Sequence, residues 1–225
     1  MGLNQSVKRI YLSIGYGKLR IKCEPTTPGA VRRENEKGTF YAIEYSSIDG
    51  ILEGISFKED PEFGNEWRIA VRDGSDNFVI QVKENSQYCR DLLKKLPNLR
   101  KGNIYKFTPY DFEDVKANKR RMGLSIKDDA DAKIGSYYQR YSEGKEYPDN
   151  INGFPDYTCK WTDKDEVKIY GLRVTSFLRK ESLAFLSGEF IKNAIESQTG
   201  ARSGLHSEED SGFVEPGEDN FDGRI

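Results

Sequence analysis

The chain has 225 residues, of which 36% are hydrophobic and 32% charged, and its formal net charge is −2. One histidine, His206, and three distant cysteines (Cys23, Cys89 and Cys159) leave little material for a zinc site, histidine-based catalysis or a disulfide framework. No apolar run approaches the ~20 residues of a membrane-spanning helix. We therefore expect a protein of a reducing compartment, with structural thiols and no bound metal or cofactor.

The first part of the chain is predicted to be β-structure. Residues 9–24 hold two short apolar-rich segments around a Gly-Tyr-Gly turn, which predicts an N-terminal hairpin. Residues 25–38 are rich in proline, glycine and charge, and they predict a loop. Residues 39–60 predict a long strand region that is interrupted near Asp49 and Gly50.

The clearest pattern lies between residues 67 and 83. Two alternating segments flank an Asp-Gly turn, which predicts a β-hairpin with one buried face. Residues 85–99 predict a helix that Asn85 or Ser86 caps and Pro97 ends. Strands are predicted at 104–113 and 120–128. The inward-facing residues of the hairpin are Trp67, Ile69, Val71, Phe78, Ile80 and Val82.

Beyond residue 130 the pattern is weaker. It predicts a strand near 133–141, a strand at 165–174 and an amphipathic helix at 178–198. Residues 199–225 combine high charge with no periodicity, which predicts disorder.

The order of elements from 39 to 128 is three strands, a helix and two strands. A five-stranded oligonucleotide-binding (OB) barrel has this order, and so does a generic α+β domain with a mixed sheet. We favour a mainly β fold with α: a five-stranded OB-type barrel at about 39–128, with an extra N-terminal hairpin and a C-terminal helix. One domain would then cover 1–198, with extensions at 1–38 and 129–198, before a disordered acidic tail at 199–225.

Basic and aromatic side chains are predicted on the outer side of this barrel. Cations that follow a phosphate backbone, with aromatic rings for base stacking, suit single-stranded nucleic acid. Each cation taken alone is equally compatible with an ordinary solvated sheet face. The loop between the first two barrel strands is acidic and adds only Lys58 and Phe63. The predicted DNA-binding residues are Arg68, Arg72, Lys83, Tyr110, Phe112, Lys116, Lys119, Arg120, Arg121, Lys127, Tyr138 and Arg140.

Several short motifs occur together in the chain: the Gly-x-Glu-Trp entry to the second strand, the Asp-Gly hairpin, the Leu-Pro-Asn helix end, the Tyr-Asp-Phe-Glu strand end and the stretch "NGFPDYTCKW". With these motifs the chain resembles the single-stranded-DNA-binding proteins of bacteriophages. The resemblance covers roughly residues 40 to 165 at the level of short patterns. It implies an OB barrel that coats single strands during phage replication or recombination, in the host cytoplasm. It does not identify individual contact residues.

The C-terminal segment is acidic, whereas the rest of the chain is mildly basic. Residues 207–225 carry seven acidic residues and one basic residue, which leaves 34 basic and 30 acidic residues elsewhere, a net charge of +4. Such segregation predicts a polyanion partner or self-regulation, in which the tail competes with DNA for basic surface. The resemblance to single-stranded-DNA-binding proteins implies that the tail also docks replication or recombination proteins. The predicted docking points are Phe213, Phe221 and Ile225. Bacterial single-stranded-DNA-binding proteins usually end in Pro-Phe, whereas this sequence ends in Arg224 and Ile225.

Two other functions stay open. The small net charge of the body favours a protein-interaction or virion-associated β module without a role on nucleic acid. A nuclease on an OB-like scaffold would need converging acidic residues and a metal. The stretch "DDADAK" at 128–133 lacks the central glycine and the distant glutamate of a calcium loop. We expect no enzymatic activity.

Overall fold

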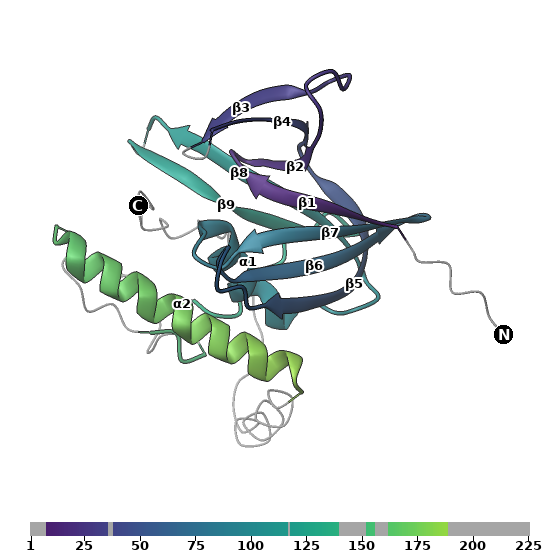
Figure 1. The fold of residues 1–225 in the computed structure, drawn as a ribbon. Helices are drawn as coiled ribbons and strands as arrows, with labels where there is room; N and C mark the ends of the chain where they lie inside the picture. Colours follow the sequence, from purple (N-terminus) through teal and green to yellow (C-terminus); the bar gives the residue numbers. More distant parts are fainter. Residues whose placement is uncertain (1–7, 36–37, 117, 140–151, 156–161, 189–225) are drawn as a thin grey trace. The chain divides into compact units, whose positions relative to one another are not determined.

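A computed structural model describes residues 8–35, 38–116, 118–139, 152–155 and 162–188 (Figure 1). The chain divides into two compact units, Met1–Ser136 and Tyr137–Ile225. The single domain predicted over 1–198 spans both units, which we describe separately. The tail predicted at 199–225, with Phe213, Phe221 and Ile225, lies outside the described residues, and so does Arg140.

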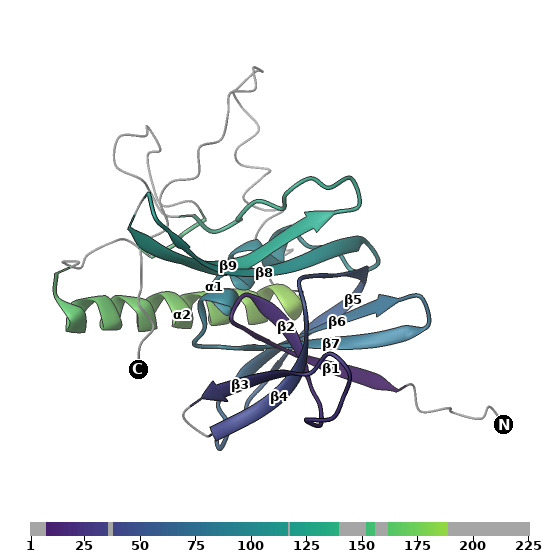
Figure 2. The same ribbon diagram turned by 90° about the horizontal axis from the view of Figure 1, so that it is seen from above.

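The first unit is a nine-stranded sheet of order β3-β4-β2-β1-β7-β6-β5-β8-β9. The sheet curls into a half-barrel, and Figure 2 shows β8 and β9 lying across from β1, β7 and β6. Neighbouring strands are antiparallel except for β1 and β7, which are parallel. The strands are β1 (Arg9–Gly15), β2 (Lys18–Lys22), β3 (Val31–Asn35), β4 (Gly38–Tyr45), β5 (Ile48–Lys58), β6 (Glu66–Asp73), β7 (Asp76–Lys83), β8 (Ile104–Asp114) and β9 (Lys119–Asp128).

The core lies on the inner side of this curl. Alternation along β6 and β7 directs every second side chain inward, as the sequence predicts. Of the predicted inward residues all are buried except Phe78, which is half-buried. The N-terminal hairpin is also confirmed, because β1 and β2 pair across a turn at Tyr16 and Gly17. The largest core side chains of the sheet are Trp67, Ile69, Ile80, Phe107, Leu19, Leu124 and Ile126.

Two predictions for the early chain are wrong. Residues 31–35 form β3 rather than a loop, because pairing with β4 orders a segment whose charged side chains give no apolar pattern. The break in the 39–60 region falls at Ser46 and Ser47, and Gly50 lies within β5. A side chain at Gly50 would place its Cβ 2.6 Å from the Arg72 carbonyl oxygen. That glycine therefore allows close strand packing rather than a turn.

The strands predicted to form a five-stranded barrel belong to the larger nine-stranded sheet. The parallel neighbour of β7 is β1, and β9 lies at one edge of the nine-stranded sheet. The N-terminal hairpin is therefore part of the sheet and not an addition outside it. Its turn rests on β8, since a Cβ at Gly17 would lie 2.7 Å from the Asp111 backbone nitrogen.

Helix α1 (Gln87–Lys95) covers the β9 edge. Ser86 caps it as predicted, accepting a hydrogen bond from the Cys89 N–H, and a 3₁₀ turn at Leu96–Asn98 contains Pro97. The Leu124 N–H of β9 donates to Asp91 Oδ2 (2.9 Å), and Lys95 Nζ donates to the Leu124 carbonyl (2.8 Å). These side chains satisfy backbone groups that an edge strand leaves open.

The second unit contains helix α2 (Lys164–Leu186). The strand predicted at 165–174 is wrong, because Asp163 accepts hydrogen bonds from the backbone N–H groups of Asp165 and Glu166 and so starts a helix there. The predicted helix 178–198 is helical through Leu186, and residues 189–198 lie outside the described part. Up to residue 139, the predicted strand 133–141 is reduced to isolated bridge residues at Lys133 and Gln139. Neither described helix has the length and apolar character needed to span a membrane.

Candidate nucleic-acid interface

The register of β6, β7 and β1 places their polar side chains on one outer side of the sheet. Three rows cross these strands. The middle row is Tyr11, Val79 and Ala70, the second is Arg9, Asn77 and Arg72, and the third is Ser13, Gln81 and Arg68. We call these nine residues, with Glu66 and Lys83 at the end of β6 and β7, the outer face. Tyr11 is 47% exposed, whereas Val79 is buried among its neighbours.

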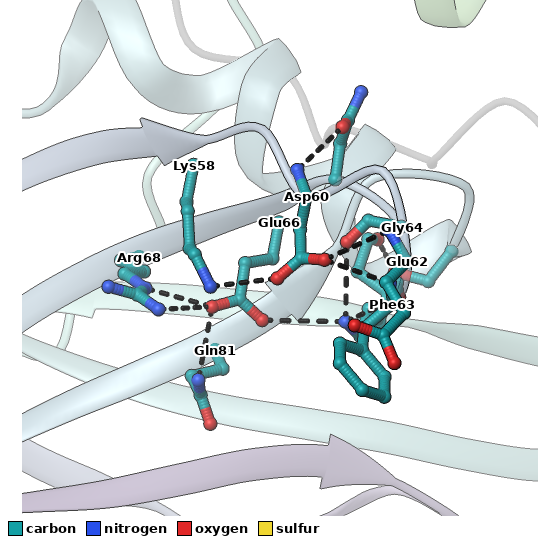
Figure 3. A network of polar contacts seen from close by, with 11 residues as sticks. Lys58, Asp60, Glu62, Phe63, Gly64, Glu66, Arg68 and Gln81 are labelled. Carbon is teal, nitrogen blue, oxygen red and sulfur yellow. Dashed lines mark hydrogen bonds and ion pairs between the residues drawn. The ribbon is translucent and has the colours of Figure 1, made fainter.

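Glu66 is the centre of a charge network on the outer face (Figure 3). Its carboxylate accepts hydrogen bonds from Arg68 Nε (2.8 Å), Gln81 Nε2 (3.1 Å) and Lys83 Nζ (3.5 Å). Burial favours the neutral acid and would raise the Glu66 pKa, but the hydrogen bonds from Arg68 and Gln81 and the charges of Arg68 and Lys83 lower it. The carboxylate is therefore ionised and offsets one of two neighbouring positive charges.

Arg72 has a different environment at the other end of β6. Its Nε lies 2.7 Å from Glu53 Oε1, and the two side chains are 43% and 41% exposed. Ion pairs this exposed contribute about 0–1 kcal/mol to stability, because water screens both charges. A phosphate group that approaches Arg72 can therefore replace the carboxylate at little cost.

The loop between β5 and β6 is held by its own acidic residues. Asp60 accepts hydrogen bonds from Lys58 Nζ (2.8 Å) and from the Phe63 N–H (2.9 Å), and these contacts lower its pKa to about 2. Lys83 donates to the Phe63 carbonyl (3.0 Å). The loop, acidic by sequence, thus uses Asp60 internally and presents Phe63 with 61% exposure.

The β8–β9 end places its predicted residues on two sides of the sheet. Arg121 and Lys127 lie on the outer side, where they pair with Asp114 and Asp131 at 2.8 Å each. Arg120 alternates to the inner side and holds Asp111 through two contacts of 2.6 Å. The rings of Tyr110 and Phe112 lie 6.0 Å apart. Phe112 is 51% exposed, whereas Tyr110 is half-buried and its hydroxyl donates to Asp91 Oδ2 (3.4 Å). Of the other predicted cations, Lys116 is exposed and Lys119 half-buried.

Tyr138 does not belong to the outer face. It lies in the second unit, where its ring is buried and stands edge-on to Phe177 at 5.3 Å. Burial raises its pKa. The placement is that of a core aromatic residue rather than of a ring open to a nucleobase.

Sequence reasoning missed the contribution of the N-terminal hairpin. Arg9 and Tyr11 reach the outer face only because β1 pairs in parallel with β7, far along the chain. The alternation of "RIYLSIG" shows that Arg9, Tyr11 and Ser13 share one side of a strand. That local signal predicts the strand but does not show which distant strand it joins.

No protein-family model, curated protein or solved structure matches the chain. Within the described ranges, no group of three His, Cys, Asp or Glu residues is placed to hold a metal ion. Function is therefore inferred from the side chains of the outer face and the loops beside it.

Proposed function

We propose that the protein binds single-stranded DNA without sequence specificity and coats it, as phage single-stranded-DNA-binding proteins do in replication or recombination. The observation that carries this proposal is the outer face. There, Arg9, Arg68 and Arg72 lie on either side of a low apolar row that ends in the exposed ring of Tyr11. Single strands need this combination, because cations follow the phosphates and rings stack on bases of any sequence.

The chain order supports an OB-type interpretation of this surface. Strands β5, β6 and β7 are followed by α1 and then by β8 and β9, and β6 and β7 would be the second and third strands of the barrel. Single strands cross those two strands in OB folds, between two flanking loops. The first of the corresponding loops carries exposed Phe63. At the other end, exposed Phe112 lies near the end of β8, and exposed Lys116 lies in the loop that follows. In this proposal β1 widens the binding face by one strand.

The ion pairs on the outer face are compatible with DNA binding. Arg72 and Glu53 form an exposed pair that water already weakens. Arg9 has neither an ion pair nor a hydrogen bond through its side chain among the described residues. The phosphates of a DNA strand can thus bind Arg9 directly. At Arg72 they can displace the Glu53 carboxylate.

A paired substitution tests the proposal. In the double variant Arg68→Gln/Arg72→Gln, binding to an unstructured fluorescent oligonucleotide should weaken, and the slope of log affinity against log salt should fall by about 1 for each lost phosphate contact. Arg32→Gln is the matched control, since Arg32 lies on β3, on the other side of the sheet from the outer face, in an exposed ion pair with Glu34. Equal affinities and slopes for wild type and the double variant would overturn the proposal.

The alternative is a protein-interaction β module, and one observation favours it. Arg68, Arg72, Arg121 and Lys127 each lie within 2.8 Å of a carboxylate oxygen, which leaves little net charge on them. If neither the full chain nor a variant ending at Gln198 binds any oligonucleotide at low salt, this alternative replaces DNA binding.

A further inference from the structure

The turn between β1 and β2 contains a tyrosine where the backbone favours another residue. Tyr16 and Gly17 both have positive φ, 53° and 66°. Two-residue hairpin turns of this kind favour Asn or Asp followed by Gly, because a larger side chain at the first position is crowded. Such outliers in the backbone concentrate at functional positions, so the tyrosine needs a reason.

The ring of Tyr16 is held from several directions. Its hydroxyl donates to the Glu34 carbonyl oxygen (3.1 Å). The guanidinium carbons of Arg20 and Arg33 lie 5.2 Å and 5.5 Å from the ring centroid, within the range of cation–π attraction. Tyr16 nevertheless remains 48% exposed. The structure thus fixes an aromatic ring at the tip of a hairpin and leaves about half of the residue open to solvent.

Arg20 adds positive charge that its surroundings do not fully balance. Its guanidinium lies against Gly15 and also over the ring of Phe40, at 5.3 Å from the centroid. Its Nε and Nη1 are buried without a hydrogen-bond partner among the described residues, and burial lowers its pKa against the opposing charge of Glu44. Glu44 itself is bound by Arg33 through two contacts, 2.8 Å and 2.7 Å. Glu44 therefore contacts Arg33 directly and acts on Arg20 only through the attraction of opposite charges.

This cluster continues the outer face. Ser13 pairs with Gln81 on β7 and with Arg20 on β2, so Arg68, Gln81, Ser13 and Arg20 form one row across four strands. Neighbouring strands are ~4.8 Å apart, which puts Arg20 roughly 14 Å from Arg68 along the sheet. A strand of nucleic acid that contacts Arg68 and continues across β1 reaches Tyr16 next.

We infer that Tyr16, Arg20 and Arg33 form an additional subsite in which one nucleobase stacks on Tyr16 and its phosphate faces the two arginines. This inference rests on the proposed function and extends it to the N-terminal hairpin. The subsite lengthens the stretch of single strand that one molecule covers. Short oligonucleotides that fill only the β6–β7 region do not need it, whereas longer ones do.

The variant Tyr16→Asn separates the ring from the turn. Asn suits the positive φ of this position, so the hairpin should fold at least as well as wild type. Loss of the stacking ring should weaken binding of a long oligothymidine about tenfold, with little change for the shortest oligothymidine that wild type binds. Tyr16→Phe keeps the ring and should bind as wild type. A 2-aminopurine in the long oligonucleotide should be quenched by wild type and Tyr16→Phe, and less by Tyr16→Asn.

The outcomes separate the two proposals. If wild type binds long oligonucleotides and Tyr16→Asn binds them equally well with equal quenching, the subsite is wrong and the proposed function stands. If Tyr16→Asn weakens short and long oligonucleotides by the same factor, Tyr16 lies within the main site and the added subsite is wrong. If neither wild type nor a variant ending at Gln198 binds any oligonucleotide at low salt, the proposed function fails, and the subsite fails with it.

Discussion

Glu66 is a carboxylate placed where a DNA-binding surface would gain from its absence. It lies nearly buried on the outer face and accepts hydrogen bonds from Arg68, Gln81 and Lys83. A negative charge here lowers the local potential but also orients both cations. Glu66 thus sets how much of the charge of Arg68 and Lys83 is available to a phosphate.

The variant Glu66→Gln should bind single-stranded DNA more tightly than wild type. The amide keeps a hydrogen-bond acceptor for Arg68 but removes the negative charge, so affinity at low salt should rise several-fold and its salt dependence should steepen. Glu34→Gln is the control, because it frees Arg32 away from the outer face. Weaker binding by Glu66→Gln in a fluorescence titration would show that orientation of Arg68 matters more than its charge.

The Asp60 carboxyl should make the free energy of unfolding fall as the pH is lowered. Its pKa is held at about 2 by Lys58 and the Phe63 N–H, below the ordinary ~3.9. The unfolded chain therefore binds more protons in this window, and the stability that Asp60 contributes is present above pH ~4 and lost as pH falls toward 2.

Replacing Asp60 by Asn should flatten this dependence. Urea unfolding between pH 5 and pH 2 should show a shallower loss of unfolding free energy for Asp60→Asn than for wild type. Below about pH 2 the two proteins should show the same slope of unfolding free energy against pH, because the wild-type carboxyl is then neutral, like the amide that replaces it. Parallel pH profiles for the two proteins would contradict the role assigned to Lys58 and the Phe63 N–H.

At the scale of elements, α1 protects the β9 edge through a buried ion pair. Asp91 and Lys95 are 2% and 6% exposed, and they satisfy the N–H and carbonyl of Leu124. Lys127 and Asp131 form a second pair at the same sequence spacing, but exposed to solvent. Both pairs join a lysine and an aspartate four residues apart, so comparing them tests how burial changes the contribution of such a pair to stability.

Lys95→Met should destabilise the protein by about 3–5 kcal/mol, because it leaves the Asp91 charge and the Leu124 carbonyl buried without this partner. Lys127→Met should cost no more than about 1 kcal/mol, since its pair is solvated. Chemical denaturation of the two variants measures both values. Similar losses for the two would show that burial of the first pair does not decide its contribution.

The β1–β2 turn closes the curl of the sheet against β8. Gly17 and Gly74 both have positive φ, 66° and 56°, but only a Cβ at Gly17 meets other atoms, at 2.7 Å from the Asp111 nitrogen. Gly17→Ala and Gly74→Ala share a backbone cost of about 1–2 kcal/mol. Gly17→Ala should lose about 1–3 kcal/mol more, from overpacking. If urea unfolding shows equal losses of unfolding free energy for the two variants, the turn does not pack closely against β8.

What the sequence predicts at this scale follows from local signals. The β6–β7 hairpin, the Ser86 cap and the two strands β8 and β9 follow from alternation and capping, which a short window contains. Strand β3 was missed because "VRREN" has no apolar side to show and is ordered by β4. Helix α2 was assigned in part to a strand because its apolar residues from Val167 to Gly171 also fit a period of two.

At the scale of the whole molecule, the sheet joins segments that are distant in sequence. The parallel pairing of β1 with β7 brings Arg9 and Tyr11 beside Arg72 and Val79. No local pattern specifies a pairing across more than 60 residues, so the sequence predicted the basic surface of β6 and β7 without its β1 border. A count of cations along the sequence also does not show that Arg120 pairs with Asp111, on the side of β9 opposite the outer face, although the Arg120 side chain is 50% exposed.

In this proposal the acidic segment 207–225, like Glu66, supplies negative charge that opposes the cations of the outer face. We propose that its seven acidic residues, tethered to the chain, compete with phosphates for the outer face at a high effective concentration. A variant ending at Gln198 should therefore bind single-stranded DNA more tightly at low salt. The gap between it and the full chain should narrow above ~0.15 M salt, where charges are screened over about 8 Å. Equal affinities across the salt series would mean that the segment is not an internal competitor.

The same titration, an unstructured oligonucleotide against the variant ending at Gln198 over a salt series, tests the central claim most directly. Removal of the acidic segment leaves the outer face without its proposed competitor, so binding should be tight at low salt. Log affinity should fall linearly with log salt, and the slope should decrease when Arg68 and Arg72 are replaced by glutamine. Absence of binding at low salt, with and without residues 199–225, would contradict the assignment of the outer face to single-stranded DNA.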